Sequence, residues 1–465
     1  MSDQEIVIVG SGLAGLRAAE RLRERGFDGY ITMVGDEPGK PYNRPPLSKQ
    51  VLMGKMRESE LGFQTFTHLG VELRSGLRAV GLDAGEHRVD LDSGESLYYD
   101  GLVIASGVEA VRMPGAPEHD DRVMVLRTLA DCQALDRHMR GAKRVAIIGG
   151  GFIGCEVAAT ARYRSLAVTL IDRAPVLLHR VLGRQLGGAL TEVHRRAGVD
   201  VRSGVAVERW TTSRAGVHLE LSDGSDVLAD LVLVAIGTRP AVSWLEGTPG
   251  VDLADGVLCD ETCHVVGLNH VVAAGDVARW PNLRFDRAPR RVEHWINAVE
   301  MARAAADSLL DGRAKTQPFT PVPRFWSEQH GIKIQSVGMP VLGERIALVE
   351  GDVAKQSFVA AYLRGPRLVG VIGFNSARSV LDCAPAVEAA NTEPIPEAGA
   401  ISPFRAASGS RHQGIAARER ARLPRTGSSG PALPAPAASP HRSRLASYYG
   451  DSAAPHRWEP VARSV

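Results

Sequence analysis

The chain has 465 residues, of which 44% are hydrophobic and 23% are charged, and its formal net charge is +2. This length predicts about three domains, and this composition is typical of a globular protein. No run of 18 apolar residues occurs, so we expect no membrane-spanning helix. The N-terminus leads directly into an apolar strand pattern without a basic leader, which predicts a cytoplasmic protein.

Charge distribution and cysteine content exclude further classes. Residues 396–465 contain ten Arg and four acidic residues, so the basic charge belongs to this segment and the rest of the chain carries −4. We therefore expect no nucleic-acid binding by the folded part. The cysteines are Cys132, Cys155, Cys259, Cys263 and Cys383. This odd, scattered set argues against a disulfide framework, and we expect Cys259 and Cys263 to be packed thiols rather than part of a metal site.

The first predicted element is a buried strand at residues 5–9, which runs into Gly10-Ser11-Gly12-Leu13-Ala14-Gly15 and an amphipathic helix. In such a turn the first glycine bends the chain, the second lets the backbone approach a pyrophosphate, and the third lets helix and strand pack closely. Alone, the motif could be only a tight strand-to-helix corner. Asp36 and Glu37 follow the next strand, where acidic groups bind ribose hydroxyls; the alternative is a solvated loop.

Residues 41–49 contain three prolines and predict a rigid surface loop that presents Arg44 and Lys49. Short strands with turns are expected over residues 71–105, ending in a buried strand before Gly107.

The glycine pattern then repeats. Residues 143–148 predict a strand, Gly149-Gly150-Gly151-Phe152-Ile153-Gly154 opens a second helix, and Asp172 ends the strand that follows. Two complete fingerprints are far more specific than one, so the sequence predicts two bound dinucleotides. Asp172 favours NADH, because a carboxylate binds ribose hydroxyls and repels a 2′-phosphate, but Arg173 leaves NADPH open.

The last third of the chain predicts a separate α+β domain and a tail. A strand ends in Gly275-Asp276, where Asp276 either contacts a cofactor or caps a helix. Further elements are expected as a helix at residues 292–310, strands over 318–374 and a closing helix at 376–390. Residues 396–465 are rich in Ser, Ala, Arg and Pro, which predicts disorder.

Five motifs, in this order along the chain, carry a resemblance to a known family. They are Pro41–Lys49, Gly149–Gly154 followed by Cys155-Glu156, Ala274-Gly275-Asp276, Val292–Ala298 and Phe325–Gln329. Residues 4–395 resemble the FAD-dependent, NAD(P)H-using ferredoxin reductases of the bacterial putidaredoxin-reductase type, with the apoptosis-inducing factors as relatives. The tail lies outside this resemblance.

The resemblance implies an α/β fold of the glutathione-reductase kind, with two Rossmann-like dinucleotide-binding domains, a C-terminal α+β domain and a disordered tail. The implied FAD-binding domain comprises residues 1–107 and 238–315, and the NAD(P)-binding domain comprises residues 108–237. Residues 316–395 would form the α+β domain and residues 396–465 the tail.

The resemblance also implies the FAD site. Gly10, Gly12, Ala14 and Gly15 would hold the pyrophosphate, and Asp36 and Glu37 the adenosine ribose. Further FAD contacts are implied at Arg44, Lys49, Val80, Arg127, Asp276, Glu293, His294, Trp295 and Trp326. We expect a packing role for His294, because hydride transfer needs no general base.

Lys49 and Glu156 match a catalytic ion pair beside the flavin. A cation there stabilises the anionic reduced ring, and the carboxylate fixes the cation in position. The alternative for Glu156 is an ordinary residue on a helix surface. The nicotinamide nucleotide would bind at Gly149, Gly151, Phe152, Ile153, Gly154, Glu156, Asp172 and Gly237.

By this resemblance the protein takes hydride from NADH or NADPH and passes single electrons to an iron–sulfur ferredoxin that supplies an oxygenase. Ferredoxins are usually acidic, so a basic docking patch is expected at Arg279, Arg284, Arg287, Arg290 and Arg291; the alternative is a solvated loop. We expect no metal site and a monomer or weak homodimer.

Four other functions stay open. A disulfide reductase needs a close cysteine pair soon after the second strand, and no cysteine precedes Cys132, which counts against it. A flavin-bound NADH oxidase or signalling protein, like the apoptosis-inducing factors, and a rubredoxin reductase are the main alternatives. A flavin monooxygenase is a weaker one.

Overall fold

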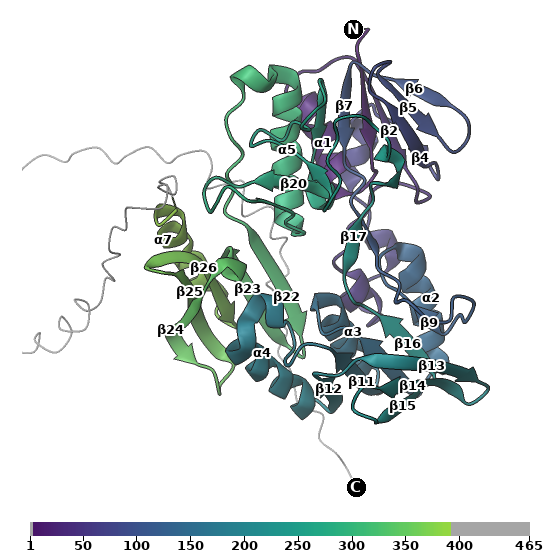
Figure 1. Ribbon diagram of the computed structural model, residues 1–465, viewed down its shortest axis with the longest axis vertical. Coiled ribbons are helices and arrows are strands. Elements are labelled where there is room, and N and C mark those ends of the chain that lie inside the picture. Colours follow the sequence, from purple (N-terminus) through teal and green to yellow (C-terminus); the bar gives the residue numbers. More distant parts are fainter. Residues whose placement is uncertain (1–2, 392–465) are drawn as a thin grey trace, which may run out of the picture. The chain divides into compact units, whose positions relative to one another are not determined.

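The computed structural model describes residues 3–391 (Figure 1). The predicted disordered tail and the last residues of the predicted α+β domain lie outside the described residues.

A five-stranded parallel sheet is built around the first strand of the chain, in the order β19-β7-β1-β2-β3. Its strands are β1 (Glu5–Val9), β2 (Tyr30–Gly35), β3 (Glu72–Ser75), β7 (Gly101–Ile104) and β19 (Val271–Ala273). The apolar run of β1 is buried, because β2 and β7 flank it and both α1 (Leu13–Glu24) and the antiparallel strand β6 (Ser96–Tyr98) pack on it. The helices α1 and α5 (Trp295–Asp311) pack side by side, and Arg21 of α1 is paired with Asp307 of α5 at 2.8 Å.

A second parallel sheet has the order β12-β11-β10-β16-β9. Its strands are β9 (Val123–Met124), β10 (Arg144–Ile148), β11 (Ala167–Asp172), β12 (Val199–Ser203) and β16 (Leu231–Val234). Its helices are α2 (Leu129–Gly141), α3 (Phe152–Tyr163) and α4 (His179–Arg196). Each parallel sheet is accompanied by an antiparallel one: β4 (Ala79–Asp83), β5 (Arg88–Leu91) and β6 (Ser96–Tyr98) for the first, β13 (Val207–Ser213), β14 (Gly216–Leu221) and β15 (Asp226–Ala229) for the second.

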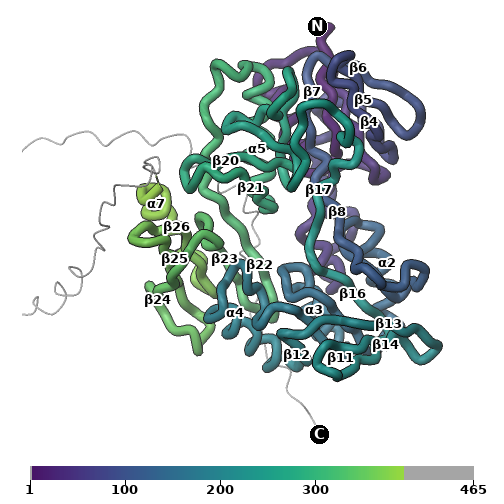
Figure 2. Tube along the Cα trace, in the orientation of Figure 1, coloured from purple at the N-terminus to yellow at the C-terminus, as the bar shows by residue number. Residues whose placement is uncertain are grey.

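The chain passes between the two parallel sheets twice, through β8 (Val108–Ala110) and β17 (Thr238–Pro240), which pair antiparallel (Figure 2). The first sheet is therefore completed by β19, a strand that follows the whole second sheet in sequence. A small sheet of β18 (Val257–Leu258), β20 (Ala278–Pro281) and β21 (Pro289–Arg290) lies beyond this crossing.

The last described region is a five-stranded antiparallel sheet in the order β22-β23-β26-β25-β24. Its strands are β22 (Arg324–Gln329), β23 (Ile332–Gly338), β24 (Arg345–Asp352), β25 (Ser357–Arg364) and β26 (Arg367–Phe374). The single closing helix predicted at residues 376–390 is wrong. Two short helices, α6 (Ala377–Asp382) and α7 (Ala384–Ala389), replace it, because Pro385 cannot donate the hydrogen bond that would continue the first.

The α/β fold class is confirmed: two parallel sheets with covering helices are followed by an antiparallel sheet with two short helices. Within residues 3–391, no helix combines the length and the apolar character needed to cross a membrane. Cys259 and Cys263 are buried free thiols, as predicted.

Candidate active site

One cavity of about 1070 Å³ runs past the carboxyl ends of strands in both parallel sheets. Open α/β sheets bind ligands at this edge, where strand-to-helix turns present backbone N–H groups. Both predicted glycine turns line the cavity, as do residues that follow β7, β16 and β19.

The two turns have the same construction. Gly10 and Gly149 adopt φ values of 120° and 110°, which only glycine accepts readily. A Cβ on Gly15 would overlap the carbonyl oxygen of Gly10, and Gly154 stands in the same relation to Gly149. Gly15 and Gly154 do not line the cavity; they let each helix pack onto its strand.

The middle glycine of each turn faces open space. A Cβ on Gly12 or Gly151 would meet nothing within 4 Å, and each of these residues caps its helix without a side-chain hydrogen bond. The first N–H groups of α1 and α3 therefore remain available to an anion at the cavity, where the helix dipole also favours negative charge.

Around the first turn, charged side chains are fixed by one another. Glu37 accepts a hydrogen bond from Tyr42 at 2.6 Å and is paired with Arg44, while Arg127 reaches Asp276 at 3.3 Å. All of these residues line the cavity, as do Ala14 and Asp36. Asp36 is more exposed and lies 3.6 Å from Arg78. Val80, on β4, is exposed and does not line the cavity.

The Lys49–Glu156 pair lies at the junction of the two sites. The Nζ of Lys49 is 2.7 Å from an Oε2 of Glu156, and the two residues are only 8% and 4% exposed. The surface loop predicted from the prolines is wrong here: residues 47–51 form a single π-helical turn that packs on α3, so Ser48 and Lys49 are buried. Glu156 is likewise no surface residue of its helix.

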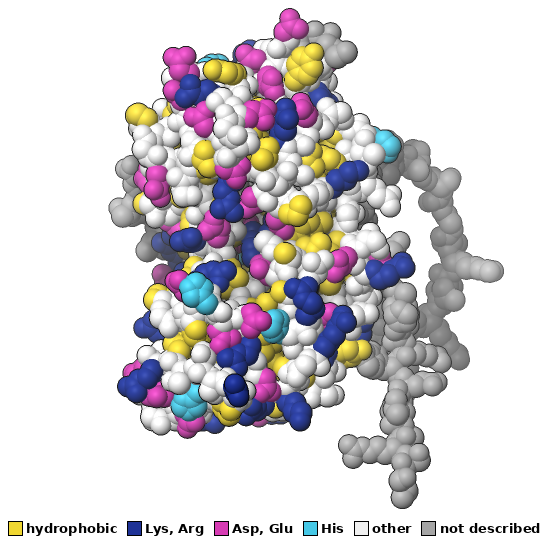
Figure 3. All heavy atoms as spheres, turned by 90° about the vertical axis from the view of Figure 1, so that its right-hand side faces the viewer, with side chains coloured by type: hydrophobic (Ala, Val, Ile, Leu, Met, Phe, Trp, Pro, Cys, Tyr) yellow, Lys and Arg dark blue, Asp and Glu magenta, His cyan; other side chains and the backbone are white. Residues whose placement is uncertain are grey.

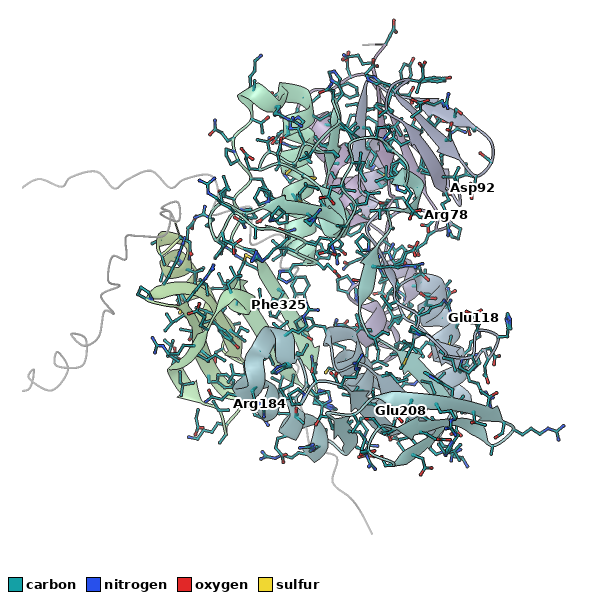
Figure 4. The ribbon with its side chains drawn as sticks, in the orientation of Figure 1. Arg78, Asp92, Glu118, Arg184, Glu208 and Phe325 are labelled. Atoms are coloured by element: carbon teal, nitrogen blue, oxygen red, sulfur yellow. The ribbon has the colours of Figure 1, made fainter. Side chains whose placement is uncertain are left out.

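Aromatic side chains form one wall. Trp295 donates its indole N–H to Asn43 at 3.0 Å and meets Trp326 edge-on, with ring centroids 6.0 Å apart. Phe325 extends from β22 between His294 and Phe152, with centroids 5.1 and 5.0 Å away (Figure 4).

His294 is half-buried against this wall, and desolvation of its ring lowers its pKa to about 4. A neutral, packed ring agrees with the packing role predicted for it. Its neighbour Glu293 lines the cavity and accepts hydrogen bonds from Thr238 and Arg291, at 2.8 and 2.7 Å.

Around the second turn, Asp172 is held by backbone alone. Its two oxygens accept hydrogen bonds from the N–H groups of Gly150 and Ala174, at 2.8 and 2.9 Å. Ile153 and Gly237 also line this part of the cavity, together with Arg173 and Arg180.

The cavity wall has the features of a surface that a ligand covers. Four of its apolar side chains are exposed: Ile153, Ile236, Trp326 and Val341. Three of its buried nitrogens have no hydrogen-bond partner within residues 3–391: Arg127 Nε, His179 Nδ1 and His294 Nδ1. With two open helix N-termini, these residues fit two dinucleotides, FAD at the first turn and NAD(H) at the second.

The sequence did not predict the hydrogen-bond partners of Glu156 other than Lys49. Ser48 and Ser327 both donate hydrogen bonds to its carboxylate. A signal for Ser327 was present, since strand alternation places it on the same buried face as Phe325, where an apolar residue is expected.

The predicted docking arginines are largely paired within the chain. Three of them face nearby carboxylates: Arg279 with Asp252 at 2.7 Å, Arg290 with Asp286 at 2.9 Å, and Arg291 with Asp255 at 2.9 Å. Arg284 donates to a backbone carbonyl at 2.7 Å, and Arg287 is exposed. The run therefore offers less positive charge than its sequence suggests. On the face that Figure 3 draws, which is the right-hand side of Figure 1, acidic and basic side chains are interspersed.

Comparison with known proteins identifies the family. Residues 4–302 match the family described as pyridine nucleotide-disulphide oxidoreductase, and residues 324–398 match the one described as reductase C-terminal. The chain belongs to the pyridine nucleotide-disulphide oxidoreductases.

Its relatives include reductases of oxygenase systems. The ferredoxin–NAD(+) reductase component of the p-cumate 2,3-dioxygenase system of Pseudomonas putida is 38% identical, covering 75% of this chain and 84% of the relative. Putidaredoxin reductase of Pseudomonas putida is 34% identical, covering 82% and 92%. The solved covalent putidaredoxin reductase–putidaredoxin complex matches with a TM-score of 0.78 at 32% identity, over 84% of this chain and 94% of that one. The protein is thus an oxidoreductase that uses FAD and NAD(H).

Proposed function

We propose that this oxidoreductase is a ferredoxin reductase whose acceptor supplies an oxygenase. One NADH gives up a hydride, two oxidised ferredoxins each receive one electron, and one proton is released. Bound FAD would supply the conversion between a two-electron donor and one-electron acceptors. The observation that carries the proposal is the single cavity that joins both glycine turns, with the buried Lys49–Glu156 pair at their junction.

The residues of this chain have separable tasks in that reaction. The first turn anchors FAD, the second turn with Asp172 orients the nicotinamide nucleotide, and Lys49 supplies positive charge where negative charge develops on the ring. The aromatic wall of Trp295, Trp326 and Phe325 excludes water from the junction.

Disulfide reduction is not supported by the arrangement of thiols. Among the described residues that line the cavity there is no cysteine, and burial raises the pKa of the Cys132 thiol to about 12. Since a thiolate is the reacting species in disulfide exchange, these thiols are unsuited to it.

We further propose NADH as the preferred donor, a cytoplasmic site of action and a monomer or weak homodimer. The proposed domain boundaries are at residues 107/108, 237/238 and 315/316, and the β8–β17 crossing supports the first two. The proposed docking site for the ferredoxin comprises Arg284, Arg287, Arg290 and Arg291. Arg287 is exposed, so a partner can reach its charge.

Steady-state assays with NADH and NADPH against ferredoxin, rubredoxin and disulfide acceptors test this function. We expect rapid NADH oxidation that depends on ferredoxin. Disulfide turnover without ferredoxin activity would overturn the proposal. Slow oxidation with every acceptor would instead favour the flavin-bound NADH oxidase or signalling protein, and turnover with rubredoxin alone a rubredoxin reductase.

A further inference from the structure

A chain of buried polar side chains leads away from the Lys49–Glu156 pair and reaches α4. Ser327 Oγ donates to Glu156 Oε1 at 2.7 Å, and Gln329 Nε2 donates to Ser327 Oγ at 3.0 Å. His194 Nε2 then lies 3.0 Å from Gln329 Oε1, and His330 Nε2 lies 3.1 Å from His194 Nδ1. Ser327, Gln329 and His194 are at most 1% exposed.

The direction of every hydrogen bond in this series of side chains follows from its final acceptor, the carboxylate of Glu156. A carboxylate paired with Lys49 can only accept, so Ser327 gives its one proton to Glu156 and must accept from the Gln329 amide. The carbonyl oxygen of Gln329 then accepts from His194 Nε2–H, which leaves His194 Nδ1 to accept from His330 Nε2–H. All donors therefore point toward Glu156.

This arrangement requires His194 to be neutral, because a second proton on its Nδ1 would face the N–H of His330. Burial lowers the pKa of His194 to about 4, although the hydrogen bond that His194 donates to Gln329 opposes this shift. Burial, followed by repulsion from His194 and Arg162, lowers the pKa of His330 to about 3. All the hydrogen bonds from His330 to Glu156 therefore have this direction at neutral pH.

The backbone holds these groups in place. Residues Phe325, Ser327 and Gln329 alternate along β22 and face inward. His330 and Gly331 have φ values of 49° and 76°, which join β22 to β23 by a tight two-residue hairpin turn and bring His330 back against α4. On the other side of Glu156, Thr160 of α3 donates to the carbonyl oxygen of Ser48 at 2.9 Å and fixes the turn that carries Lys49.

We propose that Ser327, Gln329 and His194 are positioning residues for the redox reaction, acting through Glu156 on the charge that the flavin ring experiences. Their donors balance the negative charge of Glu156, so that the positive charge of Lys49 remains available to the reduced ring. This inference rests on the FAD site of the proposed function, and it does not depend on which protein accepts the electrons.

Ser327→Ala tests the chain at its inner end. It removes the donor to Glu156 Oε1, leaves more of the carboxylate's charge uncompensated, and should shift the midpoint potential of the bound flavin to a more negative value. A spectroelectrochemical titration of the holoenzyme measures this shift. Ser327→Thr keeps the hydroxyl and should restore the wild-type potential.

Ser336→Ala is the matched control. Ser336 is a buried serine on β23, opposite Phe325 of β22, and its hydroxyl has no hydrogen-bond partner among the described residues. Its removal should leave the potential unchanged. Equal potentials for Ser327→Ala, Ser336→Ala and the wild type would overturn the inference.

His194→Phe extends the test to the outer end and should shift the potential in the same direction by less. A wild-type potential in this variant would remove His194 from the proposal. The potential is measured without any acceptor, so a protein that fails to reduce ferredoxin can still confirm or overturn this inference.

Discussion

The two glycine turns have nearly the same backbone but different surroundings. At the first, Glu37 is held by Tyr42 and Arg44, and Gly275, which follows β19, packs closely against Ala14 of the turn. At the second, Asp172 is held by backbone N–H groups, and Ile153 stands exposed at the wall. The same turn geometry is thus combined with different neighbouring side chains, and we expect those side chains to determine which dinucleotide is retained and which is exchanged.

The largest effects should come from adding a Cβ atom to the glycine that packs each helix onto its strand. Gly15→Ala would place a Cβ against the carbonyl oxygen of Gly10 and separate α1 from β1. We expect purified protein with more than about tenfold less flavin, since the pyrophosphate site is lost with the helix position. Flavin absorbance per chain measures this.

Gly154→Ala makes the same change at the second turn, and we expect it to retain flavin while its KM for NADH rises about tenfold or more. Gly141→Ala, where a Cβ meets nothing within 4 Å, is the control. Loss of flavin from Gly154→Ala to the same extent as from Gly15→Ala would contradict the division of roles.

The next test breaks the link between the two sites. Lys49→Met leaves Glu156 as a buried charge without its partner, which should lower the free energy of unfolding by about 3–5 kcal/mol and slow flavin reduction on the order of 10²-fold. Denaturant titration and stopped-flow absorbance give the two quantities.

The double variant Lys49→Met with Glu156→Leu separates stability from catalysis. Removing both charges should recover most of the stability and none of the reduction rate. A double variant that reduces flavin at the wild-type rate would show that the pair has no catalytic role.

Acid should weaken the wall beside the first turn. Because the pKa of His294 is lowered from 6.5 to about 4, the unfolded chain binds a proton in this pH range that the folded chain does not. Stability is therefore complete above pH 6.5 and falls as the pH approaches 4, by roughly 3 kcal/mol for this one residue. Denaturant midpoints across this range should fall less steeply in His294→Phe than in the wild type, and parallel curves would exclude His294 as the source.

The smallest effect concerns the choice of nucleotide. Asp172→Asn removes the charge that repels a 2′-phosphate, so the preference for NADH over NADPH should fall about tenfold, equivalent to about 1.4 kcal/mol. Glu37→Gln should leave that preference unchanged and weaken FAD retention instead. The ratios of kcat/KM for the two nucleotides check both variants, and identical ratios in Asp172→Asn and the wild type would contradict the assignment.

The features that sequence predicted correctly are those that local chemistry determines. Both glycine turns are determined by a few adjacent residues, because the turn itself requires their positive φ values and the absence of a Cβ atom. The Lys49–Glu156 pair came from a resemblance, since the two residues are 107 positions apart and nothing in their spacing joins them.

The features that sequence missed depend on packing between distant segments. Pro41–Lys49 looked like a surface loop because nothing local shows that α3 covers its end. Three of the docking arginines were neutralised by acids as many as 36 residues away, and Ser327 acquired its role only because α3 brings Glu156 to it.

The antiparallel pairing of β8 with β17 has an evolutionary and practical consequence. Val108 lies opposite Pro240, so the segment between them begins and ends at one place, the two-stranded β8–β17 sheet. Insertions whose ends meet are tolerated well, because the host fold need not stretch to accommodate them. We therefore expect that the segment between β8 and β17, which we propose as the nicotinamide-binding part, can be replaced as a unit without disturbing the first sheet.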